Sequence, residues 1–376
     1  FVPRRLLLNE KVRQTVKGDW RFPDDIRAQA AEIILADGSI RKTDAGPASS
    51  SPDNIPPQSP TTAMSQTGAA MAPLDHPWKL KRILYVESAP AEEAMHGMNE
   101  GFRAAGLVAG RDFILREASA QGDMAVLPAL ADATRSDGSE LLIAFSTPTL
   151  ETAVQKIKHI PIVFTFVADP VVAGAGRDDT HHLPNITGVY TLGPYTEMAD
   201  LLVRYFPGYR SIGTLYSPAE DNSVHNKQLF TEAAEQRGLR VTPIPVNSPG
   251  ELPDAAMALA AKPIDVIVQI LDNQSSSGFT AIARAARRAR KPLISFTESS
   301  VRQGAALALT MDYRQAGYDA ALKAADIMRG KLPATIPFSK PTRIRLVVSA
   351  DNAQVLGMTL PADLIGKADL RLGKTD

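Results

Sequence analysis

Small hydroxyl, amide and carboxylate side chains follow most of the apolar runs in this 376-residue sequence. The clearest cases are Ser146-Thr147, Asp169-Pro170, Asn222-Ser223 and Asp272-Asn273. Hydroxyl groups, together with the free backbone N–H groups at the start of a helix, can hold a carboxylate, and Asp or Glu can pair with an ammonium group. The combination suits a zwitterion such as an amino acid.

Further residues at the same kind of position complete the candidate site. The predicted ligand-binding set is Glu87, Ser88, Ser146, Thr147, Asp169, Pro170, Asn222, Ser223, Asp272, Asn273, Phe296 and Glu298. Any single Ser, Thr or Asp after a strand can instead be a helix N-cap, so the hypothesis rests on their recurrence. Phe296 would cover an apolar ligand side chain, although aromatic side chains belong more often to a core.

No motif for catalysis, metal binding or phosphate binding appears in the sequence. His181-His182 has no acidic or histidine partner at ligand spacing on a regular element, which favours a solvated loop. The arginines between 284 and 290 end a helical pattern, where the helix dipole favours cations, so we interpret them as a solvated face. We therefore predict a non-enzymatic protein without cofactor or metal.

The elements that must position these residues repeat at an offset of about 130 residues. The run Ile83-Leu84-Tyr85-Val86 is matched by Ile212-Gly213-Thr214-Leu215-Tyr216, and Gly106, which ends a helical pattern, is matched by Gly238. Short β-rich runs alternate with helical patterns, as in β-α units with parallel strands. The repeat predicts an α/β fold of two similar lobes, each with a parallel sheet flanked by helices, and a ligand cleft between them.

The composition and the order of the predicted strands and helices set the expected domain boundaries. Residues 1–43 are interpreted as the remnant of another module, with Asp37-Gly38 as a hairpin turn. Residues 44–80, rich in Ser, Pro and Thr, are expected to be a disordered linker. We assign lobe 1 to residues 81–192 plus 302–330, and lobe 2 to residues 193–301 plus 331–376.

Two helices carry specific expectations. Ser223 is a good N-cap for a helix that ends at Gly238. A last helix, from about Arg314 to Gly330, is expected to return to lobe 1.

Charge and length exclude several classes of partner. With 41 basic and 41 acidic side chains the formal net charge is zero, so no global field attracts nucleic acid. No apolar run approaches the roughly 18 residues of a membrane span, and no signal peptide is visible. Because the first residue is Phe1 rather than Met, we interpret the sequence as a fragment or a processed form. We expect a monomer that binds a small molecule.

Short motifs in a specific order carry a family resemblance. They are Gly101 to Leu107, Ala120 to Met124, Ser146 to Pro148, Ile160 to Thr165, Asp169 to Val171, Asn185 to Val189, Asn222-Ser223, Asp272-Asn273, and Ala353 to Pro361. With them, the stretch from about Lys81 to Asp369 resembles the ABC-transporter substrate-binding family of the type 1 periplasmic-binding fold, relatives of aromatic amino-acid binding proteins.

This resemblance implies a receptor that delivers a small solute to an ABC permease in the membrane. It implies a ligand held between the lobes by Ser146, Thr147, Asp169, Asn222, Ser223 and Asp272. It also implies a periplasmic or other extracytoplasmic location.

Two other functions fit the same two-lobed shape. In a ligand-sensing input domain, closure would drive a signalling module instead of transport. A two-lobed transferase would need a basic or glycine-rich grip for phosphate, whereas the strand ends here are acidic and hydroxylic.

Overall fold

The computed structural model describes residues 6–9, 30–34, 40–42 and 74–373. The chain divides into two units, residues 1–69 and 70–376. In the first unit, β1 (Leu6–Asn9), β2 (Ala30–Ile34) and β3 (Ile40–Lys42) form a three-stranded sheet. β2 and β3 are antiparallel, as a hairpin requires, and the predicted turn at Asp37-Gly38 lies outside the described residues. So does the predicted linker up to residue 73.

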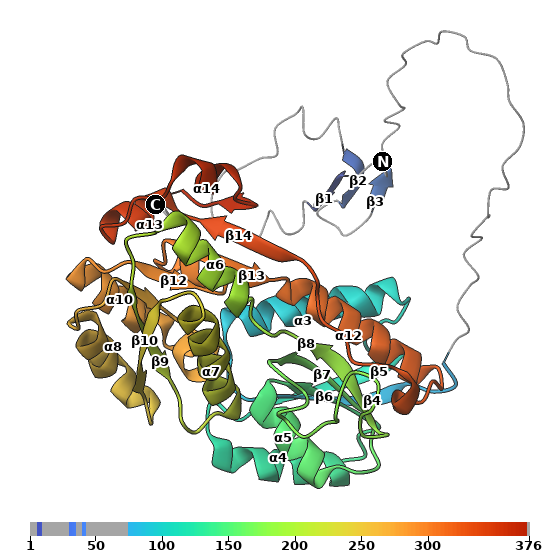
Figure 1. Ribbon diagram of the computed structural model, residues 1–376. Helices are drawn as coiled ribbons and strands as arrows, with labels where there is room; N and C mark the ends of the chain where they lie inside the picture. Colours follow the sequence, from blue (N-terminus) through green and yellow to red (C-terminus); the bar gives the residue numbers. More distant parts are fainter. Residues whose placement is uncertain (1–5, 10–29, 35–39, 43–73, 374–376) are drawn as a thin grey trace, which may run out of the picture. The chain divides into compact units, whose positions relative to one another are not determined.

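Lobe 1 of the second unit has a five-stranded parallel sheet in the order β5-β4-β6-β7-β8. Its strands are β4 (Trp78–Leu84), β5 (Phe113–Ser119), β6 (Leu141–Phe145), β7 (Ile162–Val167) and β8 (Ile186–Tyr190). Figure 1 shows α3 (Ala89–Ala104) and α12 (Tyr313–Met328) on one face, and α4 (Leu127–Ser136) and α5 (Thr147–Lys156) on the other. Successive strand side chains point to opposite faces. Ile143 and Phe145 therefore join the α3–α12 core, and Leu142 and Ala144 join the α4–α5 core.

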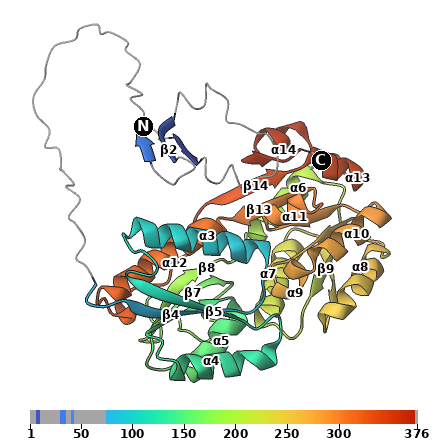
Figure 2. The same ribbon diagram turned by 180° about the vertical axis from the view of Figure 1, so that it is seen from behind.

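The helices α3 and α12 approach each other at two glycines. A Cβ added to Gly97 would overlap the carbonyl of Arg314, and one added to Gly317 would overlap the carbonyl of Ala94. Glycine allows this close backbone approach because it has no side chain. The last long helix, α12, therefore packs in lobe 1 against α3, and Figure 2 shows the pair from behind.

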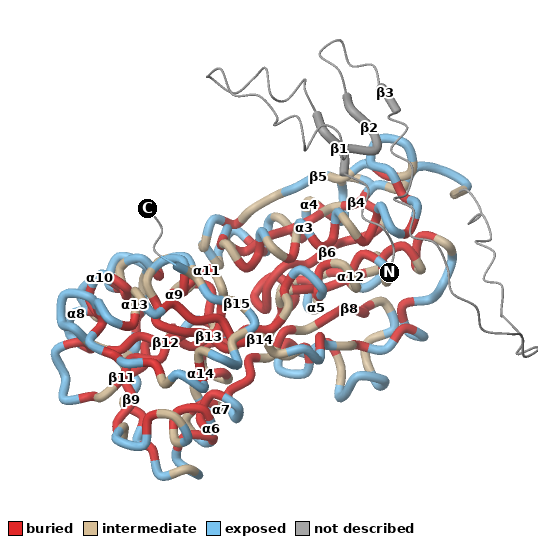
Figure 3. Tube along the Cα trace, turned by 90° about the horizontal axis from the view of Figure 1, so that it is seen from above, coloured by how far each residue is buried: buried red, intermediate tan, exposed pale blue. Residues whose placement is uncertain are grey.

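Lobe 2 has a seven-stranded sheet in the order β10-β9-β11-β12-β13-β14-β15. Its strands are β9 (Ser211–Tyr216), β10 (Arg240–Pro245), β11 (Val266–Val268), β12 (Leu293–Ser295), β13 (Leu307–Met311), β14 (Ile344–Val348) and β15 (Leu370–Arg371). β13 and β14 are antiparallel, and the other pairs are parallel. Its helices are α6 (Tyr195–Tyr205), α7 (Asp221–Glu235), α8 (Leu252–Ala260), α9 (Asn273–Ser277), α10 (Phe279–Ala289), α11 (Glu298–Arg302), α13 (Ala350–Val355) and α14 (Ala362–Gly366). Figure 3 shows the central strands of both lobes buried, whereas the edge strands β5 and β10 are partly exposed.

The two lobes repeat each other as predicted. Gly106 follows α3 and Gly238 follows α7, and both are left-handed, with φ of 73° and 76°. The predicted α/β class with two similar lobes is confirmed. The N-cap of α7, however, is Glu220 rather than Ser223. The Ser223 hydroxyl lies in the first turn and donates a hydrogen bond to Asp272 instead.

The structure corrects the lobe boundaries in three places. β13 lies between β12 and β14, so residues 302–311 belong to lobe 2 rather than lobe 1. Residues 331–339 stay with lobe 1, because the Thr187 hydroxyl donates to Ile336 O (2.7 Å) and Tyr190 N donates to Ser339 O (2.9 Å). Lobe 1 also begins earlier than predicted, because β4 starts at Trp78. Residues 302–311 and 331–339 each belong to the lobe in which they form hydrogen bonds.

Candidate ligand-binding cleft

A cavity of about 30 Å³ lies where the two lobes meet. Lobe 1 and its connections contribute Pro90, Thr147, Phe166, Ala168, Thr191 and Tyr313, and lobe 2 contributes Asn222, Asn226, Leu271, Asp272, Asn273 and Ser276. Several of these residues follow the carboxyl ends of parallel strands, where α/β sheets place their ligands. One water needs about 10–15 Å³ of such volume, so the cavity holds about two waters.

The lobe 1 wall includes the start of α5. Thr147 is the first residue of this helix and lines the cavity. Its N-cap, Ser146, makes no side-chain capping hydrogen bond. The first N–H groups of a helix have no acceptor within the helix, and the dipole makes this end positive. This wall therefore suits an anionic group such as a carboxylate.

Two residues of lobe 1 hold a left-handed backbone beside this wall. Ser146, after β6, has φ of 86°, and Phe166, in β7, has φ of 57°. The pairing of β7 with β8 shifts register between Phe164 and Val167, around the Phe166 position. The Phe166 ring meets Tyr313 edge to face, with centroids 5.6 Å apart. Such a backbone costs about 1–3 kcal/mol for a bulky residue and clusters at functional sites.

The lobe 2 wall presents hydrogen-bond acceptors. Asn222 and Asn226 lie one turn apart on α7, both are buried, and neither side-chain oxygen has a donor among the residues that the structure describes. The Asn226 amide already donates to Leu271 O (2.6 Å), which leaves its oxygen as the free group. An unpaired buried acceptor costs about 1–3 kcal/mol. A ligand N–H group would satisfy both oxygens.

Asp272 adds a buried carboxylate to the same wall. Its Oδ2 accepts a hydrogen bond from the Ser223 hydroxyl (2.7 Å), and its Oδ1 accepts one from Ser275 N (2.6 Å) as the N-cap of α9. Burial raises the pKa of Asp272 above its usual range. A cationic ligand group would favour the ionised carboxylate.

Glu220 is a second buried carboxylate close by. It accepts hydrogen bonds from Asn273 N (2.9 Å), Asn273 Nδ2 (2.7 Å) and Gln274 N (3.0 Å). Burial, and then the charge of Asp272, raises the pKa of Glu220 to about 7. The side-chain amide of Asn273 is thus held by Glu220, although Asn273 also lines the cavity.

Of the predicted ligand-binding residues, Thr147, Asn222, Asp272 and Asn273 line the cavity. Ser146 precedes Thr147 as the N-cap of α5, and Ser223 donates a hydrogen bond to Asp272, but neither serine lines the cavity. Asp169 is paired with His225 across the lobes, with Nε2 3.4 Å from Oδ2. Pro170 is buried next to it.

The remaining predicted residues lie elsewhere. Ser88 caps α3 by accepting a hydrogen bond from Ala91 N (3.4 Å), and Glu87 is exposed. Phe296 is fully buried in the lobe 2 core, where its ring meets Tyr195 edge to face (4.9 Å), so it is a core residue.

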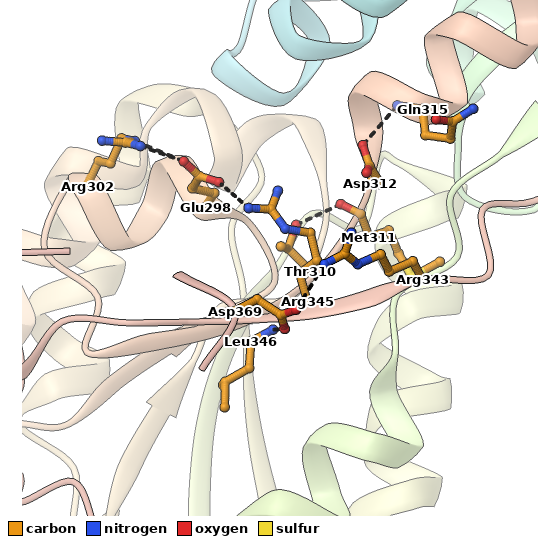
Figure 4. A network of polar contacts seen from close by, with 10 residues as sticks. All are labelled: Glu298, Arg302, Thr310, Met311, Asp312, Gln315, Arg343, Arg345, Leu346 and Asp369. Atoms are coloured by element: carbon orange, nitrogen blue, oxygen red, sulfur yellow. Dashed lines mark hydrogen bonds and ion pairs between the residues drawn. The ribbon is translucent and has the colours of Figure 1, made fainter. Parts of the chain in front are cut away.

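The Glu298 carboxylate forms ion pairs with two arginines. Its carboxylate pairs with Arg302 (2.6 Å) on the same helix and with Arg345 (3.4 Å) on β14. Figure 4 shows this chain of charges next to Asp312, which caps α12 by accepting a hydrogen bond from Gln315 N. Glu298 therefore stabilises the region where β13 leads to α12, and it does not line the cavity.

Sequence reasoning missed three important residues of the cleft. The sequence pattern could have indicated Asn226, because it lies four residues after Asn222 and so on the same helix face. Phe166 lies within an apolar run and faces the cavity only because of its irregular backbone. Thr191 lies on a connection between the lobes, where no local pattern marks it.

Residues 81–371 match the family described as ABC transporter substrate binding protein. The chain belongs to this family. Membership confirms the predicted family resemblance and the prediction of a binding protein rather than an enzyme. None of the helices that the structure describes is long and apolar enough to cross a bilayer.

Individual relatives agree with this assignment. The chain is 27% identical to the Tyrosine-binding protein of Clostridioides difficile (strain R20291), over 74% of this chain and 81% of that protein. A solved conserved domain protein from Vibrio cholerae is 29% identical, with a TM-score of 0.75 over 78% of this chain and 99% of that one. An ABC domain in complex with L-Trp from Streptococcus pneumonia shares the fold, with 23% identity and a TM-score of 0.73 over 78% of this chain and 100% of that chain.

Proposed function

We propose that this protein is the solute receptor of an ABC importer and that it closes on an amino acid or a related zwitterion. The observation that carries the proposal is the opposite chemistry of the two cavity walls. Lobe 1 offers the uncapped start of α5 at Thr147, and lobe 2 offers Asp272 with the free oxygens of Asn222 and Asn226. A carboxylate would bind the first wall and an ammonium group the second.

Closure follows because each lobe binds a different charged group of the same ligand. A ligand that contacts both lobes stabilises the closed form by its differential affinity for that form. The cavity of about 30 Å³ is too small for an amino acid, so the lobes or side chains must move to admit one. A ligand bearing one charge would satisfy only one wall and would favour closure less.

The ring pair Phe166–Tyr313 supports a ligand with an apolar side chain. Both residues line the cavity, and their rings meet edge to face, so they supply apolar surface to it. The name of the Clostridioides difficile relative points to the same class of ligand. The partner would be a membrane permease that recognises the closed lobes on the extracytoplasmic side.

A thermal-shift screen of the twenty amino acids tests this function. A ligand at 100 times its Kd stabilises the protein by about 2.7 kcal/mol, which raises Tm measurably. We expect at least one amino acid, from the apolar or aromatic group, to raise Tm in a concentration-dependent way. If sugars or polyamines raise Tm and no amino acid does, the proposed ligand class is wrong.

A further inference from the structure

An ion pair joins the two lobes beside the cavity. Asp169 lies in the loop after β7 of lobe 1, and His225 lies on α7 of lobe 2, with His225 Nε2 3.4 Å from Asp169 Oδ2. The neighbouring residues Ala168 and Asn226 both line the cavity. The pair therefore connects the lobes at the edge of the ligand site.

The Asp169 carboxylate is held in place. Its Oδ1 atom accepts hydrogen bonds from Val171 N (2.7 Å) and Val172 N (3.3 Å), which leaves Oδ2 for the histidine. His225 Nε2 is buried and makes no hydrogen bond within the described part of the chain, so the ion pair with Asp169 is available to it. The two side chains are only 26% and 24% exposed, so solvent screens them less than a surface pair.

We propose that Asp169 and His225 form a latch that holds the lobes closed and slows the release of ligand. The latch replaces the predicted role of Asp169 as a ligand contact. The effect of the latch on ligand release rests on the proposed function. Its effect on the distance between the lobes does not depend on which ligand binds. Opening the cleft separates the two side chains, so the energy of the pair is lost only in the open state.

The pair carries opposite charges when the imidazole is protonated. On α7, Asp221 lies one turn before His225, and its charge acts on Glu151 of α5. Burial, followed by the charges of Asp221 and Glu220, raises the pKa of Glu151 to about 7.

The other titratable group that Asp169 faces is Tyr190 on β8, and the charge of Asp169 contributes to raising its pKa. Tyr190 is therefore neutral near pH 7. Because the pKa values of Glu151 and Glu220 are raised to about 7, a single release rate would also contain their contributions. The coupling between Asp169 and His225, measured as a double-mutant cycle, removes these shared contributions.

The chain contains a matched control pair. His181 and Asp178 form the same kind of ion pair, 2.8 Å apart, but both lie in one loop of lobe 1. Their separation cannot change when the lobes open. The variants His181→Gln and Asp178→Asn therefore report the general effect of losing a histidine–aspartate pair.

The first measurement is stopped-flow release of L-tyrosine and L-tryptophan from the wild type, His225→Gln, Asp169→Asn and the double variant. Asn at position 169 still accepts the two backbone hydrogen bonds. At pH 6 we expect each single variant to release ligand about three to five times faster, the range of a modest ion pair, with little change in the association rate. The double variant should be no faster than the singles.

The second measurement needs no ligand. The sequence has no Cys, so Ala129→Cys on α4 and Ala258→Cys on α8, both exposed, can be spin-labelled cleanly. We expect the distance distribution between the labels to shift toward longer, open distances in His225→Gln at pH 6, and not in His181→Gln.

The two measurements separate the possible failures. If neither release nor the label distance changes in the Asp169 and His225 variants, the latch is wrong, even if an amino acid binds. If the label distance responds but no amino acid binds, the latch stands and the proposed ligand is wrong.

Discussion

The Ser223 hydroxyl on α7 donates a 2.7 Å hydrogen bond to the Asp272 carboxylate at the start of α9. The same hydroxyl accepts a hydrogen bond from Ser217 N (2.8 Å), so its proton is directed toward Asp272. The segments that follow β9 and β11 of lobe 2 are thereby tied together around one carboxylate. The acceptor wall of the cleft is preorganised before any ligand arrives.

The charge of Asp272 should matter more for binding than for folding. Asp272→Asn keeps an N-cap acceptor for Ser275 N, so the fold should remain. Loss of a charge-paired hydrogen bond in a desolvated site should weaken amino-acid binding by about 2 kcal/mol or more. Calorimetry with L-tryptophan and L-tyrosine measures this. Asp200→Asn, which breaks a surface pair with Arg237, is the control, and equal affinities of both variants would remove Asp272 from the site.

Asn222 should affect stability and binding in opposite directions. Its buried side-chain oxygen has no donor, so Asn222→Ala should leave the free energy of unfolding unchanged or increase it. The same change should weaken ligand binding by about 1–2 kcal/mol, because a ligand N–H group loses its acceptor.

Asn352 gives the matched comparison for that experiment. Its side-chain amide donates to Val301 O (2.7 Å) and Ala305 O (3.0 Å) in lobe 2. Asn352→Ala should destabilise the protein in chemical denaturation without changing ligand affinity. A loss of stability in Asn222→Ala as large as in Asn352→Ala would mean that Asn222 is structural.

Substitution by glycine should reduce the free energy of unfolding less at Phe166 than at Phe164. Both lie in β7, but Phe164 is fully buried, whereas Phe166 is half-buried with φ of 57°. Phe164→Gly should cost at least about 3–5 kcal/mol, as for loss of a core Phe. In Phe166→Gly the relief of about 1–3 kcal/mol of backbone strain should offset much of the lost burial.

The same variant should change ligand preference. Without the Phe166 ring, affinity for L-tryptophan should fall more than affinity for L-alanine, as measured by calorimetry. A parallel loss for both ligands would show that the ring does not contact the ligand side chain.

Glu151 should make stability depend on pH. Burial raises its pKa to about 7 in the folded protein, above the ordinary value of 4.5. The free-energy cost of burying the ionised Glu151 carboxylate is absent below pH 4.5, grows as the pH rises, and is complete above pH 7. Glu151→Gln should therefore stabilise the protein by about 1–2 kcal/mol at pH 8 and by much less at pH 5, allowing for solvent screening.

Denaturant unfolding at both pH values measures that difference, with the exposed Glu235→Gln as control. An identical effect of Glu151→Gln at pH 5 and pH 8 would contradict the raised pKa.

The sequence predicted the parts of the fold that local patterns determine. Gly106 and Gly238 mark equivalent helix ends because a left-handed residue there is a local requirement. The boundary at residues 302–311 was wrong because strand periodicity does not say which sheet a strand joins. β13 pairs with β12, which precedes it closely in the sequence, and with β14, which follows a long excursion through lobe 1.

The site was predicted only in part, for a similar reason. Residues after strands converge at one edge of each sheet, so the prediction includes Thr147, Asn222, Asp272 and Asn273, which line the cavity. Glu298 follows a strand in the same way, but its charge is used by Arg345, a partner 47 positions later that no local pattern indicates. Phe166 depends on a register shift that the side-chain pattern does not encode.

The most direct test of the central claim compares three ligands by calorimetry: L-tyrosine, tyramine and 3-(4-hydroxyphenyl)propionate. The three share a side chain, but tyramine lacks the carboxylate and the propionate lacks the ammonium group. If a carboxylate binds the start of α5 and an ammonium group binds the Asp272 wall, L-tyrosine should bind at least about tenfold more tightly than either analogue, a difference of about 1.4 kcal/mol. Binding of either analogue as tight as that of L-tyrosine would contradict a cleft whose two walls each hold one charge of a zwitterion.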